Sequence, residues 1–531
     1  MAAIDDEASI SVANHPPENS LSSAAAADEE LRLLDDVVRS LPPAVVKDLL
    51  SLEVCPQCVL RLLGKYGPSY CNSSSIFSLF SAVVGDQLSS DVSLSGESDK
   101  KDVYCSVCFG ILQFIYADEK QSLVKKDCAN DLAVLIAELA RQEGHQIDDF
   151  TLEVSIPPII VEKDNAKRLF IKEKYGSEIW FQDVLQSEAL SVKDALKISI
   201  TQPLETLLGI KSGTSSFRVR LTYTSSDYPT KTVNERESKQ AYKKQKTGIS
   251  NGIRTSNGSD IGDNLKDENS LTNGKVSACC LTIQLHRTPI FIGGRYLKLS
   301  RNVSQTRWII DDERMGEASV EEILANSVLP MCRGDNCKFH AAGREDIDVR
   351  MLGSGRPFLL EIQNPKVEPS QASLREMEFK INNSESKLVK VKNLKVVNEQ
   401  GWTLMREGEA EKQKEYAALV WISRELEEKD LETISSLKDL QVLQRTPVRV
   451  LHRRSPLERE KIIHWMKIEK ISGSSQYFLL HLCTQAGTYI KEFVHGDLGR
   501  TQPSLGSILG CRAEILQLDV TDVKMDCFMT E

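Results

Sequence analysis

Residues 343–350, Gly-Arg-Glu-Asp-Ile-Asp-Val-Arg, bring together side chains that could do chemistry. Two Asp, one Glu and two Arg follow the glycine within seven residues, and an apolar, strand-like run begins at Phe358. A carboxylate beside a fixed cation can act as a nucleophile or as a general base, because the cation favours its ionised form. Charges this crowded are costly to bury unless they pair, so a loop of this composition is more often a solvated surface turn.

Two Cys-x-x-Cys pairs are separated by 46 intervening residues: Cys55 and Cys58, then Cys105 and Cys108. Two such pairs supply four thiolates that can close tetrahedrally on Zn²⁺, and a closed four-thiolate site leaves no position open for water. The spacing therefore predicts a structural zinc site, with buried thiols or a redox pair as the alternative. No second site is expected from Cys332, Cys337 and His340, because these three irregularly spaced ligands lack a fourth.

Two later segments are locally basic. Residues 281–310 hold five Lys or Arg and no acid, and residues 441–470 hold eight Lys or Arg against three acids. Basic side chains hold phosphates and aromatic ones stack on exposed bases, which is the combination that looped RNA requires. For the second segment a solvated basic strand is an equally good interpretation. The predicted RNA-contacting residues come from these two segments, with Arg344 of residues 343–350 added. They are Arg295, Tyr296, Arg301, Trp308, Arg344, Arg449, Arg453 and Arg454.

Composition limits the class of protein. Residues 1–36 contribute −8 of the formal net charge of −10, so the rest of the 531-residue chain is nearly neutral. No run of about 18 apolar residues occurs, which argues against a membrane span, and the acidic N-terminus resembles no signal or transit peptide. The 13 Cys are interpreted as thiols and metal ligands, so we expect a cytoplasmic or nuclear protein, or one found in both. No glycine-rich nucleotide loop is apparent, so no organic cofactor is expected.

The elements that must position these residues are predicted from periodicity. Apolar residues at helical spacing predict helices over 29–40, 43–52 and 127–143, and over 192–208 with a break at Pro203. Alternation and β-rich composition predict strands over 153–161, 217–223, 278–286 and 387–397. The pattern Ser319-x-x-Glu322 predicts a capping box that starts a short helix, and Ser455-Pro456-x-Glu458 predicts a further helix start.

The domain organisation follows from composition. Residues 1–28 lack periodicity, and residues 225–274 are too polar to offset the entropy of ordering, so both are expected to be disordered. A basic patch within the second, residues 239–246, is interpreted as solvated linker charge, with a nuclear-import or RNA-contacting patch as the alternative. Residues 29–290 are then an accessory region and residues 291–531 a second domain.

Several of these segments resemble one protein family. Gly343-Arg344-x-Asp346 resembles the catalytic signature of pseudouridine synthases, and the longer pattern over 343–353 resembles the THUMP-containing branch that acts on uridines 54 and 55 of the tRNA T loop. Residues 293–308, 444–456 and 486–500 resemble further elements of these enzymes, although Arg307 stands where proline is expected. The resemblance covers most of the chain outside residues 1–28 and 225–274.

The resemblance implies roles for individual residues. It makes Asp346 the catalytic carboxylate, Lys491 the basic residue that pairs with it, and Tyr416 the aromatic residue placed against the flipped uracil. Without the resemblance, Tyr416 would more often be a partly buried structural tyrosine. Composition alone also does not show whether Asp346 or Asp348 is the catalytic acid, because two residues apart in an extended segment their side chains share one face. The family's accessory domain carries a four-cysteine zinc site, which matches the two Cys-x-x-Cys pairs.

The implied fold class is α+β, with a zinc-bearing, THUMP-type accessory region followed by a catalytic domain on a mixed or antiparallel sheet with flanking helices. The implied function is isomerisation of uridine to pseudouridine in the T arm of tRNA by base flipping, carried out by a monomer. A zinc-bearing RNA-binding adaptor stays open, but it would not need Asp346, Tyr416 and Lys491 to converge. A THUMP-linked methyltransferase or sulfurtransferase would need a nucleotide or adenosine loop that is not found.

Overall fold

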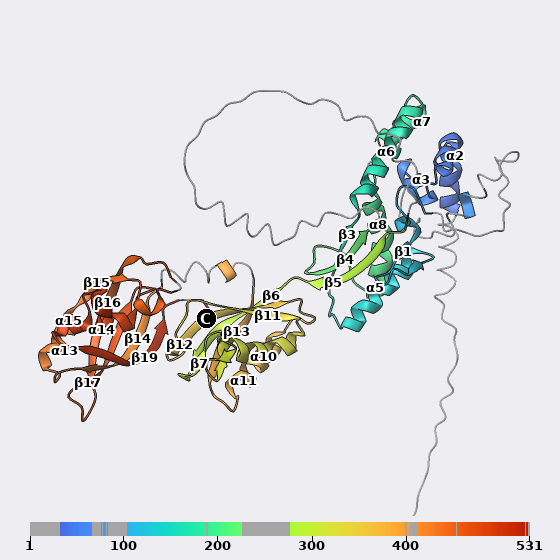
Figure 1. Ribbon diagram of the computed structural model, residues 1–531. Coiled ribbons are helices and arrows are strands. Elements are labelled where there is room, and N and C mark those ends of the chain that lie inside the picture. Colours follow the sequence, from blue (N-terminus) through green and yellow to red (C-terminus); the bar gives the residue numbers. More distant parts are fainter. Residues whose placement is uncertain are drawn as a thin grey trace, which may run out of the picture. The chain divides into compact units, whose positions relative to one another are not determined.

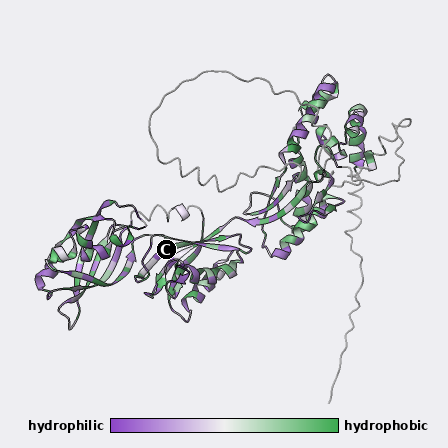
Figure 2. Ribbon diagram, in the orientation of Figure 1, coloured by the Kyte–Doolittle hydropathy of each residue, from purple (hydrophilic) through white to green (hydrophobic). Residues whose placement is uncertain are grey.

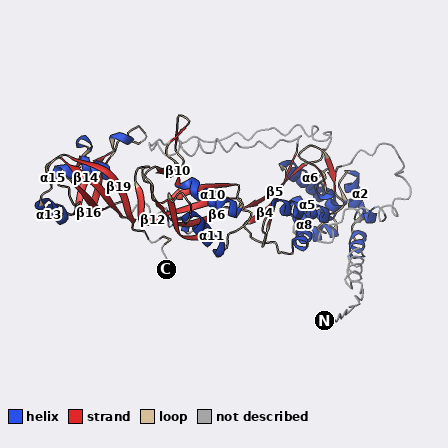
Figure 3. Cartoon of the chain, turned by 90° about the horizontal axis from the view of Figure 1, so that it is seen from below, coloured by secondary structure: helices blue, strands red, loops and turns tan. Residues whose placement is uncertain are grey.

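The computed structural model describes residues 32–65, 76, 78–80, 82, 104–186, 189–225, 277–398, 401–403, 405, 412–452, 454–525 and 527–528. These residues form two compact units that divide between His286 and Arg287, with residues 144–146 grouped with the second unit. Disorder is predicted for residues 1–28 and 225–274. Apart from Ser225, all of these positions lie outside the described residues. More of the described residues of the first unit lie in helices than in strands, whereas strands dominate the second unit (Figure 3).

The first unit is built on a five-stranded mixed sheet in the order β2-β1-β5-β4-β3. Its strands are β1 (Ile115–Ala117), β2 (Leu123–Lys125), β3 (Thr151–Ser155), β4 (Phe217–Thr224) and β5 (Cys280–Arg287). The helical elements are α2 (Pro43–Ser51), α3 (Pro56–Leu62), η2 (Ile111–Gln113), α5 (Ala129–Glu143), α6 (Pro158–Tyr175), α7 (Ile179–Gln186) and α8 (Val192–Leu208). Buried and less buried residues alternate along β4, because successive side chains of a strand point to opposite faces.

Two predictions in this unit are wrong. The strand expected over 153–161 ends at Ser155, and α6 begins at Pro158, because a proline N–H is not needed in the first turn of a helix. The helix α8 does not break at Pro203 but continues to Leu208, since its apolar face stays buried on both sides of the proline.

The second unit is built on a ten-stranded mixed sheet in the order β13-β6-β12-β19-β14-β17-β16-β15-β18, with β11 paired to β12. Its strands are β6 (Ile290–Lys298), β11 (Asn336–Ala341), β12 (Arg350–Gln363), β13 (Val389–Val397), β14 (Lys414–Ile422), β15 (Lys438–Arg445), β16 (Glu458–Lys470), β17 (Tyr477–Thr484), β18 (Thr501–Gln502) and β19 (Ala513–Val523). Short pairs are formed by β7 (Val303–Ser304) with β10 (Ala318–Ser319) and by β8 (Ile309–Ile310) with β9 (Glu313–Arg314). The helical elements are α10 (Val320–Cys332), α11 (Gln371–Asn382), α13 (Glu428–Ser436), η3 (Val448–Val450), α14 (Ile490–His495), η4 (Asp497–Gly499) and α15 (Leu505–Leu509). A mixed sheet with flanking helices agrees with the predicted α+β class.

The strand β12 joins two halves of this sheet. It pairs antiparallel with β6 and β11, and it meets β19 in parallel through two residue pairs, Arg350 with Asp519 and Met351 with Val520. The helices α10 and α11 pack against the half that contains β11 and β13, whereas α13 and α14 pack on the half that contains β16 and β19 (Figure 1). Because Arg350 is the first residue of β12, the charged loop that precedes it lies at the junction of the two halves.

One predicted helix start in this unit is present and one is wrong. The hydroxyl of Ser319 accepts the N–H of Glu322 at 3.2 Å and caps α10. Glu458 does not begin a helix; it begins the strand β16, where its carboxylate accepts a hydrogen bond from Arg445 on β15 at 2.7 Å. The cross-strand ion pair and ladder therefore decide the conformation of this segment.

Apolar and polar residues intermingle along the helices and strands of both units (Figure 2). Buried apolar side chains form one cluster in the first unit and a separate one in the second. Each unit therefore has its own hydrophobic core. Within the described ranges, no helix has both the length and the apolar composition needed to cross a bilayer.

Candidate active site

The charged loop, residues 342–349, connects β11 to β12. Gly343 has a φ of 93°, a left-handed conformation that residues with side chains rarely adopt. A Cβ atom at this position would lie 2.8 Å from Nη1 of Arg356 and 3.0 Å from Nζ of Lys414. The left-handed turn therefore favours glycine here, and a larger residue would also displace the ends of the Arg356 and Lys414 side chains.

The carboxylate of Asp346 faces two cations. Nη1 of Arg449 donates a hydrogen bond to its Oδ2 at 3.1 Å, and Nζ of Lys491 lies 3.6 Å from the same oxygen. The Asp346 side chain is 39% exposed, so a molecule outside the protein can reach it. Asp346 is therefore an accessible carboxylate beside two basic side chains.

Lys491 lies closer to Asp348 than to Asp346. Its Nζ donates to the two carboxylate oxygens of Asp348 at 3.0 and 2.8 Å. Partial burial acts to raise the pKa of Asp348, but the hydrogen bond and charge of Lys491 hold it below its ordinary value. The expected approach of Lys491 to Asp346 is thus present, but Lys491 is shared between two acids.

Arg449 is the basic residue nearest to Asp346, and a buried acid orients it. Its Nε donates to Oε1 of Glu492 at 2.7 Å, and Glu492 is 2% exposed. The other Glu492 oxygen is buried and has no hydrogen-bond partner within the described residues. Arg449 therefore supplies the hydrogen bond and the positive charge that stabilise this buried carboxylate. Glu492 thereby holds the guanidinium of Arg449 toward Asp346.

Two local elements bring these side chains to the loop. Arg449 lies in η3, and both Lys491 and Glu492 lie in the first turn of α14. The buried side chain of Gln444, near the end of β15, accepts the N–H of Tyr489 at 2.9 Å and donates to its carbonyl at 3.0 Å. This pair of bonds fixes the chain where α14 begins, and so fixes the direction of its first turn.

Beneath the loop lies a fully buried polar cluster. Nε of Arg356 donates to Glu345 at 2.8 Å, and the side chains of both residues are 1% exposed. The hydroxyl of Tyr296 also donates to Glu345 at 2.8 Å, and Gln305 donates to that hydroxyl at 2.8 Å. Burial and the charge of Glu345 raise the pKa of Tyr296 well above its ordinary value. Sequence reasoning missed these roles, although Glu345 and Arg356 lie in or beside the charged loop.

Two predicted RNA contacts are contradicted by this burial. Arg295 is 1% exposed, and its guanidinium donates to the Ser354 side chain and to the carbonyls of Ser354, Gly355, Val523, Met525 and Cys527. Tyr296 is 0% exposed and bound to Glu345, so it cannot stack on a base. Both residues are internal supports of the fold.

The other predicted RNA contacts differ in their access to solvent. Arg301 is engaged internally, through an ion pair with Asp519 at 2.7 Å and a bond to the Leu518 carbonyl at 2.8 Å. Trp308 is 40% exposed, and both Arg344 and Arg454 are exposed. Arg449 is 40% exposed despite its two ion pairs. Arg453 lies outside the described residues.

Tyr416 is on β14 and is 9% exposed. Burial raises its pKa to about 12, although the charge of Arg356 and a hydrogen bond with Thr484 act in the opposite direction. The neutral phenol is therefore the form present at physiological pH. The ring belongs to the same buried apolar cluster as Tyr296, so little of its surface is open to a substrate base.

In the first unit, the structure brings together the sulfur atoms of Cys55, Cys58, Cys105 and Cys108. The four thiols are buried, and their ligand atoms all lie within 4.8 Å of one another. Backbone N–H groups of Cys55, Val107 and Cys108 lie 3.3, 3.4 and 3.5 Å from Sγ of Cys105 and donate to it. Donors aimed at sulfur stabilise a thiolate, which is the form that ligates a metal. The donor set therefore fits a closed four-thiolate metal site.

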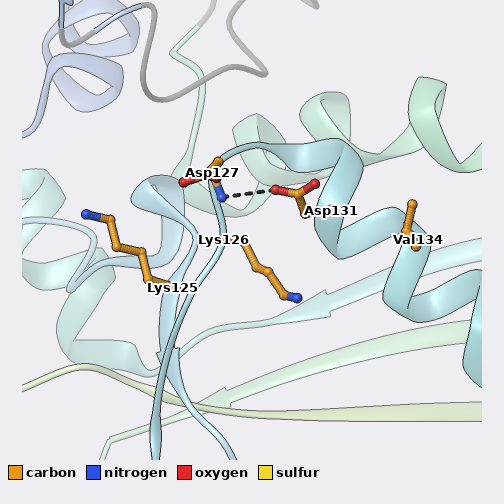
Figure 4. Close-up of a pocket in the computed structure, with 5 residues that line it drawn as sticks. All are labelled: Lys125, Lys126, Asp127, Asp131 and Val134. Carbon is orange, nitrogen blue, oxygen red and sulfur yellow. Dashed lines mark hydrogen bonds between the residues drawn. The ribbon is translucent and has the colours of Figure 1, made fainter.

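A second feature of the first unit is an open hollow of about 320 Å³ (Figure 4). It is lined by Lys125, Lys126, Asp127, Asp131 and Val134. The Asp131 carboxylate accepts the N–H of Asp127 at 3.1 Å and satisfies a donor before α5 begins at Ala129. Two lysines and two aspartates balance in charge, so this hollow offers no distinctive chemistry.

Comparisons with known proteins agree with the motifs. The family model described as "Pus10, C-terminal" matches residues 291–524, and that described as "Eukaryotic Pus10, N-terminal" matches residues 105–251. The chain is 36% identical to the tRNA pseudouridine synthase Pus10 of Homo sapiens, over 80% of this chain and 78% of that protein. It is 39% identical to the tRNA pseudouridine synthase Pus10 of Thermofilum pendens, over 46% of this chain and 54% of that protein.

Similarity to solved structures is weaker. A crystal structure of a Cbf5-Nop10-Gar1 complex matches at 16% identity and a TM-score of 0.24, covering 43% of this chain and 48% of that chain. A crystal structure of pseudouridylate synthase matches at 14% identity and a TM-score of 0.18, covering 46% of this chain and 71% of that chain. At these TM-scores the likeness carries no argument. The matches in sequence, which extend through both units, show that the chain belongs to the Pus10 family.

Proposed function

We propose that this protein isomerises uridine to pseudouridine in the T loop of tRNA, at position 54, position 55 or both, with Asp346 as the catalytic carboxylate. Membership of the Pus10 family makes it a pseudouridine synthase, an isomerase that acts on RNA. The finer proposal is carried by one observation: Asp346 is 39% exposed and lies 3.1 Å from an arginine nitrogen that a buried glutamate orients.

The chemistry needs an accessible anion. The target uracil must leave its stack, because its C6 and the sugar C1′ cannot be reached inside folded RNA. Asp346 then supplies a carboxylate oxygen as nucleophile or base, while Arg449 and Lys491 stabilise its charge. The bond between N1 and C1′ breaks, a bond between C5 and C1′ forms, C5 loses a proton and N1 gains one. The nucleotide keeps its composition, so the reaction consumes no cofactor.

The substrate contacts are proposed from exposure and charge. Arg344 and Arg454 offer exposed guanidinium groups for phosphates, and Trp308 offers an exposed ring for base stacking. Tyr416, although only 9% exposed, is the proposed aromatic contact of the uracil. We retain Arg453 as a further phosphate contact. The proposed partner is the T arm of tRNA, bound by a monomer in the cytoplasm, the nucleus or both.

For the first unit we propose a THUMP-type RNA-binding domain and a structural Zn²⁺ ion held by the four clustered cysteines. Four thiolates leave no coordination position for water, so a metal bound there supports the fold. The catalytic steps proposed above do not pass through it. Its expected contribution is to the stability of the N-terminal unit.

The proposal is tested by incubating the full chain with an unmodified tRNA transcript and mapping pseudouridine chemically. We expect pseudouridine at one or both T-loop positions and its absence from a transcript in which both uridines are cytidines. No T-loop pseudouridine with the folded protein, or pseudouridine only at other sites, would contradict the proposed specificity.

A further inference from the structure

Side chains hold the backbone of the charged loop at five of its carbonyl groups. Arg356 donates to the carbonyl of residue 342 at 2.8 Å, and Gln305 to that of residue 343 at 2.8 Å. Lys298 donates to the carbonyls of residues 346 and 347 at 3.3 and 2.7 Å. Arg301 donates to the carbonyl of residue 348 at 2.9 Å. Three of these four donors come from one segment, residues 298–305, which runs from the end of β6 to the residue after β7.

Lys298 is the most unusual of these donors. It is 0% exposed, although burying an ammonium group is costly and lysine is rarely found fully buried. Its third acceptor is the carbonyl of Val303 at 2.8 Å, so one amine ties the start of β7 to the loop that carries Asp346. An apolar side chain could fill this volume without the cost of desolvation, but it could not hold two successive carbonyls of the loop.

We propose that Lys298 is a positioning residue for the reaction of Asp346: its buried ammonium fixes the peptide groups at residues 346 and 347 and so holds the carboxylate in place against Arg449. This inference rests on the proposed function, because positioning has meaning only if Asp346 reacts. It also gives the segment 298–305 a different role from the RNA contact that its basic composition predicts. A displacement of about 1 Å in a reacting group can cost about a hundredfold in rate.

The charge on Lys298 makes this support dependent on pH. Burial lowers the pKa of Lys298 to about 8; the carboxylates of Glu345, Asp348 and Asp346 act to raise it, and the charge of Arg301 acts to lower it. Above pH 8 the amine loses its proton, and with it one of its three donors, so the hold on the loop weakens. The proposed reaction should therefore slow as the pH rises through about 8.

The stability of the fold should change in the opposite direction over the same range. The pKa of Lys298 is about 8 in the folded protein and near the ordinary 10.5 when the chain unfolds. Between these values the unfolded chain binds more protons, so this group favours the folded state more as the pH rises. A rate that falls above pH 8 without loss of folded protein would therefore separate positioning from stability.

The test compares Lys298→Met with a control of similar burial. Methionine keeps the aliphatic stem and removes the ammonium. Ile381→Ala is the control, because Ile381 is 2% exposed on α11 and its loss lowers stability without removing a donor to the loop. Single-turnover pseudouridine formation, tRNA affinity and amide hydrogen exchange over residues 343–349 are measured on the full chain, the rate from pH 6.5 to 9.

For Lys298→Met we expect a single-turnover rate about a hundredfold lower and no alkaline decline near pH 8. Affinity for tRNA should change less than about twofold, and the loop amides should exchange about tenfold faster or more. Ile381→Ala should keep the wild-type rate, pH profile and loop exchange. A wild-type rate in Lys298→Met, an equal loss in the control, or a slow variant with unchanged loop exchange would overturn the inference. If the wild-type protein forms no pseudouridine, the proposed function fails, and loop exchange still decides whether Lys298 orders the loop.

Discussion

Asp346 and Asp348 lie on one loop and share Lys491, but Asp346 also accepts a hydrogen bond from Arg449. The proposed reaction needs the negative charge of Asp346, and asparagine keeps the side-chain shape without that charge. We expect Asp346→Asn to lower the single-turnover rate by at least about a thousandfold while tRNA affinity and the fold are preserved. Chemical mapping of pseudouridine and a binding titration, run on the same preparations, check this outcome.

Asp348→Asn is the matched control for that substitution. Asp348 is 57% exposed and pairs with Lys491, and an exposed ion pair contributes about 0.2–1 kcal/mol to stability. We expect a rate loss of less than about tenfold, because Lys491 remains near Asp346. A folded but inactive Asp348→Asn enzyme beside an active Asp346→Asn enzyme would reverse the assignment of the catalytic acid.

The two basic residues near Asp346 should also differ. Arg449 donates to Asp346 at 3.1 Å and is held by the buried Glu492, whereas Lys491 is 3.6 Å away and engaged by Asp348. We expect Arg449→Gln to lower the single-turnover rate about tenfold more than Lys491→Gln does. Arg449→Gln should also cost about 1–3 kcal/mol of stability, because it leaves Glu492 buried without its partner. The reverse order of rates would mean that Lys491 leaves Asp348 when RNA binds.

At the scale of elements, the charged loop depends on the buried pair of Glu345 and Arg356 beneath it. Removing one member of a buried ion pair leaves an uncompensated charge, which costs about 3–5 kcal/mol. We expect Arg356→Met to destabilise the second unit by about this amount, and Arg356→Met combined with Glu345→Gln to recover part of it. Hydrogen exchange of β12 amides in the full chain reports the loss. Additive effects of the two substitutions would show that the pair does not act as a unit.

At the scale of the whole molecule, the two units have separate cores, so loss of the metal site should affect them unequally. We expect one Zn²⁺ per folded chain, and none after Cys55→Ser with Cys105→Ser. Because metal binding supplies folding free energy, the first unit should then lose exchange protection, while β12 and β14 of the second unit keep theirs. Elemental analysis and hydrogen exchange check this outcome.

Cys128→Ser provides the control, because Cys128 is a half-buried thiol of the same unit outside the cluster. It should keep both the metal and the exchange protection of the first unit. A folded native protein that contains no metal, or equal loss of protection in both units of the double variant, would contradict a structural zinc site confined to the first unit.

The sequence by itself determined the features that depend on neighbouring residues. The two Cys-x-x-Cys pairs, the Gly343 turn before Asp346 and the cap at Ser319 are local patterns, and the structure contains each of them. The family resemblance likewise rests on short motifs, and the relatives confirm it. Predictions failed where the conformation of a segment depends on a distant partner. A helix was predicted to start before Glu458, but this residue begins a strand, because its partner Arg445 on β15 lies 13 residues away in sequence.

Only the tertiary structure decided which way the basic and aromatic residues of β6 face. Arg295 and Tyr296 are neighbours on a strand, so they point to opposite faces of the sheet. One face is covered by Glu345 and Arg356, and the other by the carbonyl groups of Val523, Met525 and Cys527, so both side chains are buried. Arg449 reaches Asp346 across 103 positions of sequence, through η3 and the buried Glu492 on α14. The sequence shows which charged side chains are present. The packing of elements distant in sequence decides which of these side chains stay at the surface and which support the charged loop.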